Sequence, residues 1–330
     1  MRSSIPLFAL VVVTCAVAAL APWAGSAPAG VTYSQFTTPT TAPGHANPTW
    51  CPDGSQIAYD DRDADPNNPS LEYKSYPAGS ESPMAASRRE SVDYAPNLSQ
   101  IVYAKLDGTW EHIYVRPIGG GTETAITTGT AGPAGPVGFY GDWQPSFSPD
   151  GQWIAFSSSR GDPVYGAYSI WVVKTDGTGL KKIGGVYGAT TWPTWEPSGN
   201  AVVYSDAAFL YRVARTGSTT WGTAVQIADH ANHARFSHDG KFLAFDYQGD
   251  IYVMNYATMT RANLTNDGTS PAGPEDSSPT WGATNDVIAF SSRGRNGNAN
   301  AAIWVASGVQ SVLATPTEVV TLGKVKATYR

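Results

Sequence analysis

One phrase recurs six times along the chain and limits the folds that it can adopt. Each copy has a small residue or proline two positions before an aromatic residue, and a turn after it, as in Pro145-Ser146-Phe147-Ser148-Pro149-Asp150-Gly151. The aromatic positions are 44, 53, 48, 41 and 45 residues apart and are occupied by Trp50, Tyr94, Phe147, Trp195, Phe236 and Trp281. A period of about 40 to 50 residues is typical of architectures built from repeated supersecondary units.

Each copy also carries the pattern of a four-stranded sheet. After the turn comes an apolar strand such as Ile154–Phe156, then a second such as Ile170–Val172, an Asp-Gly turn and a short last strand. Asp-Gly and Pro-Asp-Gly favour turns because Gly supplies a positive φ and Pro presets φ. The sequence predicts an all-β fold, a six-bladed β-propeller with four antiparallel strands in each blade. The closing strand is Val31–Phe36 or Glu318–Lys326, and seven-bladed closure with an irregular last blade is the alternative.

Composition agrees with many short strands and excludes several classes of protein. Gly and Pro account for 34 and 24 of the 330 residues, and charged residues for only 15%, against about 25% in a typical soluble domain. The net charge of −6 and the lack of a Lys/Arg cluster exclude a nucleic-acid partner. We find no Gly-x-Ser-x-Gly elbow, phosphate loop or dinucleotide fingerprint in the sequence.

The repeat resembles that of the TolB-type, WD-repeat-like β-propellers over roughly residues 45–315. The resemblance rests on the aromatic-Ser-Pro-Asp-Gly phrase, on segments such as Ile154-Ala155-Phe156, and on Arg160-Gly161 after the second strand. The copies after Tyr94 and Trp281 lack the Gly of this phrase. Only about 20 residues lie between the apolar N-terminus and the first copy, too few for the α/β domain of TolB. The resemblance therefore implies the propeller fold and not the Tol–Pal role.

The N-terminus has the pattern of a secretory signal. Arg2 precedes the apolar stretch Ile5–Ala21, and small residues follow at positions 24–29. We predict a signal peptide over residues 1–29, a single propeller domain over 30–330, an exported protein, and no membrane span once the signal is removed. A lipoprotein at Cys15 or an uncleaved N-terminal anchor is the alternative. The only other cysteine is Cys51, for which we predict a buried, unreactive thiol.

Alignment of the six copies predicts which residues surround the central channel: Asn47, Ser91, Gln144, Trp192, His233 and Ser278. Aromatic rings near this mouth would offer flat surfaces to a sugar or peptide, with polar groups fixing its orientation. The predicted ligand-binding residues are Trp143, Trp192, Tyr140, Gln144, His230, His233 and Asn47. The alternative is that both Trp side chains pack as wedges between blades.

Two segments contain side chains that could coordinate a metal ion. His230 and His233 could supply two imidazoles, with His45 or Glu275 as a third ligand. Oligogalacturonate lyases are similar propellers that hold a metal with histidines, and the resemblance implies no more than that. The residues Asp61, Asp63 and Asp65 alternate as in a calcium loop, although Pro66 stands where such a loop needs Gly. The alternative is a recurrent turn in which Arg62, Arg160 and Arg293 pair with carboxylates.

These observations favour a non-catalytic binding or scaffold module in the envelope or outside the cell. Its partner is an envelope or extracellular protein, or a glycan, held at the mouth of the channel. We expect a monomer without a cofactor, with calcium or another divalent cation as the alternative. The second function that the sequence allows is a polysaccharide lyase or hydrolase at the same mouth, with Glu275, Asp276 and His233 as candidate catalytic residues.

Overall fold

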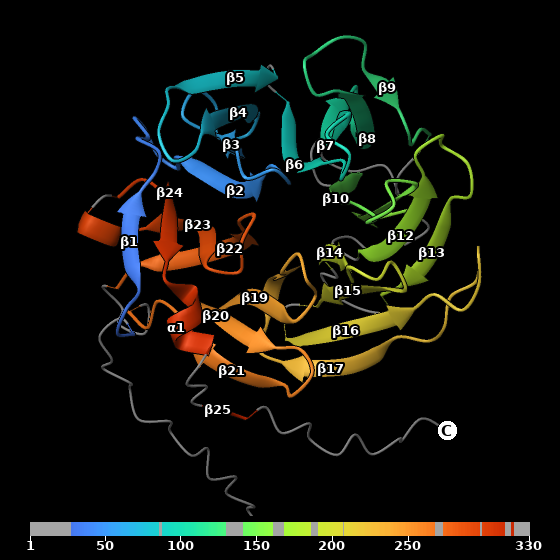
Figure 1. Cartoon of the computed structure of the whole chain (residues 1–330). Helices are drawn as coiled ribbons and strands as arrows, with labels where there is room; N and C mark the ends of the chain where they lie inside the picture. The colour runs from blue at the N-terminus through green and yellow to red at the C-terminus, as the bar shows by residue number, and fades with distance from the viewer. Residues whose placement is uncertain are drawn as a thin grey trace, which may run out of the picture.

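Six antiparallel sheets form blades around a common axis in the computed structural model (Figure 1). The structure describes residues 28–85, 88–129, 141–160, 168–185, 191–206, 208–267, 273–297, 299–313 and 318–319. The predicted signal peptide falls almost wholly outside these residues. In five blades the first strand in sequence is innermost, and in the sixth the strand Glu275–Trp281 is; these six strands contact one another around the axis. The six-bladed β-propeller that the sequence predicts is confirmed.

The first three blades follow one another along the chain without interruption. Their strands are β2 (His45–Trp50), β3 (Gln56–Asp61), β4 (Ser70–Ser75) and β5 (Glu81–Ala85); β6 (Arg89–Tyr94), β7 (Gln100–Asp107), β8 (Trp110–Pro117) and β9 (Thr124–Ala125); and β10 (Asp142–Phe147), β11 (Trp153–Ser158), β12 (Ser169–Lys174) and β13 (Lys181–Gly184). Neighbouring strands pair antiparallel in each blade.

The last three blades complete the ring, and a short α-helix, α1 (Val309–Leu313), follows them. A 3-10 turn, η1 (Arg295–Gly297), lies within the sixth blade. The strands are β14 (Thr191–Trp195), β15 (Ala201–Ser205), β16 (Phe209–Ala214) and β17 (Val225–Asp229); β18 (Asn232–Phe236), β19 (Phe242–Tyr247), β20 (Asp250–Asn255) and β21 (Thr260–Asn263); and β22 (Glu275–Trp281), β23 (Val287–Arg293) and β24 (Ala302–Ser307).

An N-terminal strand closes the ring. Strand β1 (Thr32–Gln35) pairs antiparallel with β24, so it becomes the fourth strand of the sixth blade. The C-terminal strand β25 (Glu318–Val319) instead pairs with β21 as a fifth strand of the fifth blade. The segment Val31–Phe36 is therefore the closing strand, and the alternative of an irregular seventh blade is wrong, because the two terminal strands join different blades.

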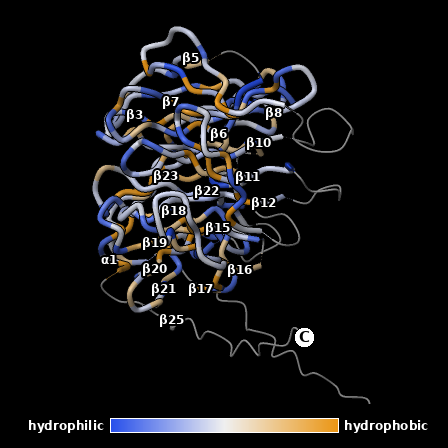
Figure 2. Tube along the Cα trace, turned by 90° about the vertical axis from the view of Figure 1, so that its right-hand side faces the viewer, coloured by the Kyte–Doolittle hydropathy of each residue, from blue (hydrophilic) through white to orange (hydrophobic). Residues whose placement is uncertain are grey.

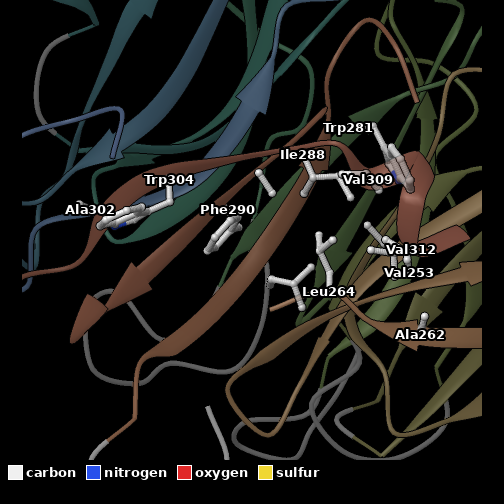
Figure 3. Close-up of a cluster of buried hydrophobic side chains, with 13 residues drawn as sticks. Val253, Ala262, Leu264, Trp281, Ile288, Phe290, Ala302, Trp304, Val309 and Val312 are labelled. Atoms are coloured by element: carbon white, nitrogen blue, oxygen red, sulfur yellow. The ribbon is translucent and has the colours of Figure 1, made fainter. Parts of the chain in front are cut away.

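The hydrophobic core lies between successive blades. In the side view the apolar segments run through the interior of the ring (Figure 2). Between the fifth and sixth blades, Val253 and Leu264 pack against Ile288 and Phe290, and α1 adds Val309 to the same cluster (Figure 3). Burying an aliphatic or aromatic side chain contributes about 1.5 to 3 kcal/mol, so the ring is held chiefly by these interfaces.

A turn follows each innermost strand, and in the third blade the Ser148–Gly151 phrase makes it. In the third blade the Ser148 hydroxyl donates to Asp150 and accepts the N–H of Trp153, while Gly151 N–H donates to the Ser148 carbonyl. Gly151 has a φ of +67°, which a residue without a side chain adopts freely. The turn therefore starts the second strand in a fixed register.

A bulge interrupts the innermost strand of every blade at the same place. There the register shifts against the second strand, and one residue adopts a left-handed φ between 48° and 57°. These residues, which we call the entrance ring, are Asn47, Ser91, Gln144, Trp192, His233 and Ser278. None is Gly, and a left-handed residue with a Cβ costs roughly 1 to 2 kcal/mol. The bulge defines the channel end at which the innermost strands begin.

Ser91→Gly is expected to raise the free energy of unfolding by about 1 kcal/mol. Gly relieves the left-handed strain and keeps the backbone N–H that donates to Asp60. Ser75→Gly, in a strand with ordinary φ, serves as the control and should lower stability. Urea unfolding measures both variants, and a loss of stability in Ser91→Gly would contradict the strain argument.

Candidate functional site

Hydrogen bonds across blade boundaries fix the entrance ring. Asp60 accepts the Ser91 N–H at 2.8 Å and the Asn47 amide at 2.7 Å. Asp246 accepts the Ser278 N–H at 2.9 Å and contacts His233 Nδ1 at 2.5 Å. Burial raises the pKa of Asp60 to about 7, with the Arg62 guanidinium opposing the rise. These carboxylates therefore tie one blade to the next.

The channel is narrow at the entrance ring. A cavity of only about 10 Å³ remains between Asn47, Ser91, Trp192, His233 and Ser278. The ring of Trp192 meets that of His233 edge-on, with centroids 4.6 Å apart. A space of this size holds about one water molecule, so a larger ligand at this end would lie on the entrance rather than inside the channel.

The other predicted ligand-binding residues lie in separate places. Gln144 accepts the Trp192 N–H at 3.0 Å, which brings it next to the entrance ring cavity. Trp143 packs edge-on against Tyr168, and half-exposed His230 lies against Tyr247. Tyr140 lies outside the described residues.

The three candidate catalytic residues have different partners. Glu275 lies 3.7 Å from Arg293, and Asp276 forms a 2.5 Å ion pair with Arg295. His233 is held by Asp246. Burial raises the pKa of Asp276 to about 6, and Arg295 opposes this rise. General acid–base catalysis needs two groups within hydrogen-bond reach of one substrate, and these contacts do not join the three residues into such a pair.

Among the residues that the structure describes, two groups of side chains could hold a metal ion. Asp250, Asp267 and Asp276 form one, and the Arg295 guanidinium already occupies it, with a 2.8 Å contact to Asp267. The other joins Asp61 and Asp63 to His45. Burial lowers the pKa of His45, while Glu81, Asp63 and Asp61 oppose the effect.

The remaining predicted metal ligands lie elsewhere. Asp65 accepts hydrogen bonds from Asn67 and Asn68 within its own turn. His230 and His233 contact Asp229 and Asp246, respectively. Arg62 pairs with Glu90 at 2.8 Å, as Arg160 does with Asp142 at 2.7 Å, so the recurrent Arg turn is present.

A larger cavity opens where the innermost strands end, and we call it the funnel. Its volume is about 360 Å³, within the range of small-ligand pockets. The repeat aromatic residues and turn prolines form its wall: Trp50, Tyr94, Phe147, Trp195, Phe236, Trp281, Pro52, Pro96, Pro149 and Pro197. His238, which the sequence places at a turn, also lines it.

Two opposite charges face the funnel without pairing with each other. Asp93 and Arg235 both line it and are partly buried. Within the described part of the chain neither forms an ion pair; Asp93 accepts the Phe147 N–H, and Arg235 donates to the Pro193 carbonyl at 3.3 Å. Burial raises the pKa of Asp93 and lowers that of Arg235, and each charge opposes the effect on the other.

Sequence reasoning did not select Asp93 and Arg235, although a signal was present. Both occupy the repeat position two residues after the entrance ring, where the other copies have Thr49, Ser146, Thr194 and Thr280. Charged residues at a position that is otherwise small and neutral indicate a role beyond the repeat itself. Perturbed pKa values in a cavity point the same way.

A curated protein is similar to part of the sequence. No model of a known protein family matches the chain. An uncharacterized protein of Agrobacterium fabrum is 32% identical over 111 residues, which are 34% of this chain and 33% of that protein. The chain thus spans about a third of the length of the curated relative that it matches.

Solved structures define the class of protein. TolB from Acinetobacter baumannii superposes with a TM-score of 0.57 at 19% identity, over 78% of this chain and 64% of that one. A gluconolactonase from Xanthomonas campestris gives 0.63 at 12% identity, over 86% and 91%. The chain is therefore a β-propeller protein, with a fold similar to those of both neighbours. Scaffolds and enzymes both occur among such propellers, so the fold alone decides nothing about activity.

In the part of the chain that the structure describes, no helix has both the length and the apolar character needed to cross a membrane.

Proposed function

We propose that the chain is an exported, non-catalytic binding propeller that holds a charged segment of a partner protein in the funnel. The observation that carries the proposal is that Asp93 and Arg235 lie on the wall of one 360 Å³ cavity and form no ion pair within the described part of the chain. Partly buried charges are unfavourable unless something pairs with them. A bound ligand with groups of both signs would supply the missing partners.

The rest of the funnel supports a peptide ligand. Its wall combines aromatic rings such as Trp50 and Trp195 with prolines such as Pro197, which suits apolar side chains. Arg235 would receive a carboxylate, and Asp93 an ammonium or guanidinium group. Proteins carry groups of both signs, whereas most glycans offer hydroxyl or carboxylate groups only.

The entrance ring supports the second ligand class, a glycan. Trp192 is partly exposed there, beside the amide and hydroxyl groups of Asn47, Ser91 and Ser278. An aromatic face with neutral polar neighbours suits an uncharged sugar. The prediction that Trp143 and Trp192 bind a ligand at this end therefore stays open beside the funnel proposal.

A screen of the mature chain tests both ends of the channel. A displayed library of random peptides and a glycan array are screened against wild type, and the affinities of the selected binders are measured by fluorescence polarisation. Peptides are expected to lose about 10- to 100-fold in affinity on Arg235→Met, because one charge-assisted contact contributes about 1.5 to 3 kcal/mol. The Trp143→Ala/Trp192→Ala variant is the matched control and should bind these peptides as wild type does.

Three results would overturn the proposal of a non-catalytic binder at the funnel. Glycans that bind wild type and are lost only with Trp143→Ala/Trp192→Ala would move the site to the entrance ring. Peptides whose affinity is the same for wild type and Arg235→Met would show that the charged couple is not the binding site. Turnover of any selected glycan would support the lyase or hydrolase instead.

A further inference from the structure

A buried imidazole and two carboxylates lie close together where β2 begins and β3 ends. His45 begins β2 and lies opposite Asp61, the last residue of β3, and Asp63 follows two residues later. One ligand atom from each of the three residues lies within 4.8 Å of the other two. This cluster is distinct from the funnel and from the entrance ring.

The His45 side chain points into this cluster without a hydrogen bond. Only 3% of the side chain is exposed, and its Nδ1 has no partner. Its Nε2 lies 3.6 Å from Asp61 Oδ1 and 3.7 Å from Asp63 Oδ2, too far for a hydrogen bond. The ring stacks on Tyr59 at 4.8 Å, which fixes its plane. A buried imidazole whose two nitrogens both lack a hydrogen bond with the described residues is costly unless something else binds it.

The two carboxylates also lack a counter-charge. Among the described residues, no Lys or Arg forms an ion pair with Asp61 or Asp63. Asp63 Oδ2 accepts two hydrogen bonds from Thr40, at 2.6 and 2.8 Å, whereas its buried Oδ1 has no partner. Two neighbouring negative charges that share a site favour a bound cation.

We propose that His45, Asp61 and Asp63 form a binding site for a divalent transition-metal ion, with zinc as the best fit. Zinc binds imidazole nitrogen and carboxylate oxygen at about 2.0 to 2.2 Å, which puts two tetrahedral ligand atoms about 3.4 Å apart. The distances of 3.6 and 3.7 Å are close to this spacing. Calcium fits less well because it takes six to eight oxygen ligands, and Asp65 belongs to a separate turn.

The site lies against the segment that joins the closing strand to the first blade. Thr40 donates to Asp63, Thr38 donates to Glu81, and the Phe36 N–H donates to Ile303 in the sixth blade. Gly44, next to His45, approaches Ala301 so closely that a Cβ would lie 2.2 Å from its carbonyl oxygen. A metal ion would therefore hold the first blade to the connection that closes the ring, and its role is structural.

Calorimetric titration of the chelator-stripped full chain tests the site, with zinc, manganese and calcium chlorides as probes. We expect one zinc ion per chain, weaker manganese binding, and about 100-fold weaker zinc binding in Asp63→Asn and His45→Asn. His112→Asn is the matched control, because His112 is also buried and lies 3.6 Å from a carboxylate, that of Asp142, which Arg160 already neutralises. Zinc should raise the unfolding temperature of wild type and of this control alone.

Cobalt(II) provides a second measurement that does not depend on stability, because its visible absorption reports a four-coordinate site. Asp63→Asn keeps the proposal testable even if His45→Asn does not fold, since Asp63 is partly exposed. Unchanged zinc affinity in Asp63→Asn would overturn the proposal. So would an absence of zinc binding by wild type, or tighter binding of calcium than of zinc.

Discussion

The double variant Arg235→Met/Asp93→Asn is expected to be more stable than wild type, by about 1 to 3 kcal/mol in the free energy of unfolding. The two charges face the funnel and form no ion pair with the residues that the structure describes, so the free protein gains little from them and loses part of their hydration. Met fills the space of the Arg stem, and Asn keeps an oxygen for the Phe147 N–H. Urea unfolding at neutral pH measures the change.

The control is another Arg–Asp pair, one whose two side chains are in contact. Arg160 lies 2.7 Å from buried Asp142, which also accepts the Ser158 hydroxyl. Arg160→Met/Asp142→Asn should lower stability, because it removes contacts that are made in the free protein. If the funnel variant loses as much stability as this control, the two charges serve the fold and not a ligand. If the funnel variant gains stability and loses peptide binding, the two charges serve function at the expense of stability.

Glu111→Gln is expected to remove a large pH dependence of stability. Burial, reinforced by the Glu90 carboxylate, raises the pKa of Glu111 to about 8, and its buried Oε2 has no partner among the described residues. The folded protein therefore binds more protons than the unfolded chain between about pH 4.5 and pH 8, so stability falls as pH rises through this window. The difference between the pKa values of the unfolded and folded states corresponds to a loss of roughly 5 kcal/mol in the free energy of unfolding above pH 8.

The measurement compares urea unfolding of wild type and Glu111→Gln at pH 4 and pH 9. The two proteins should be about equally stable at pH 4, and the variant should be more stable at pH 9. Glu123 is a control of opposite sign: burial raises its pKa, but hydrogen bonds from Lys105, Tyr103 and Arg89 outweigh this and lower it to about 2. Glu123→Gln should lose stability at pH 9. Equal stability of Glu111→Gln and wild type at both pH values would contradict the prediction.

The repeat was enough to predict the blades because each copy contains its own turn and strand pattern. The Ser148–Gly151 turn is local, and hydrogen bonds within five residues hold it. The closing strand was harder, because β1 pairs with residues about 270 positions later and two terminal segments had suitable patterns. Register across that distance depends on the assembled ring and not on local sequence.

The candidate sites show where sequence reasoning stopped. The repeat alignment put Trp192 and His233 at one level of the channel, and the structure has them in contact. It could not tell that the entrance is nearly closed, because cavity volume depends on how side chains pack. The alternation Asp61-Arg62-Asp63 was visible, yet the imidazole that meets these carboxylates comes from another strand. Only the register of β2 against β3 brings His45 there.

Strand β1 also sets an order of events during synthesis. Its partner β24 is made about 270 residues later, which takes on the order of 15 to 50 s at typical rates of translation. Until then the β1 segment has no sheet to join, and a nascent chain of five finished blades has an unpaired strand edge at each end. The emerging protein is thus an open arc that becomes a ring only in its last step, and that interval is when it most needs shielding from other chains.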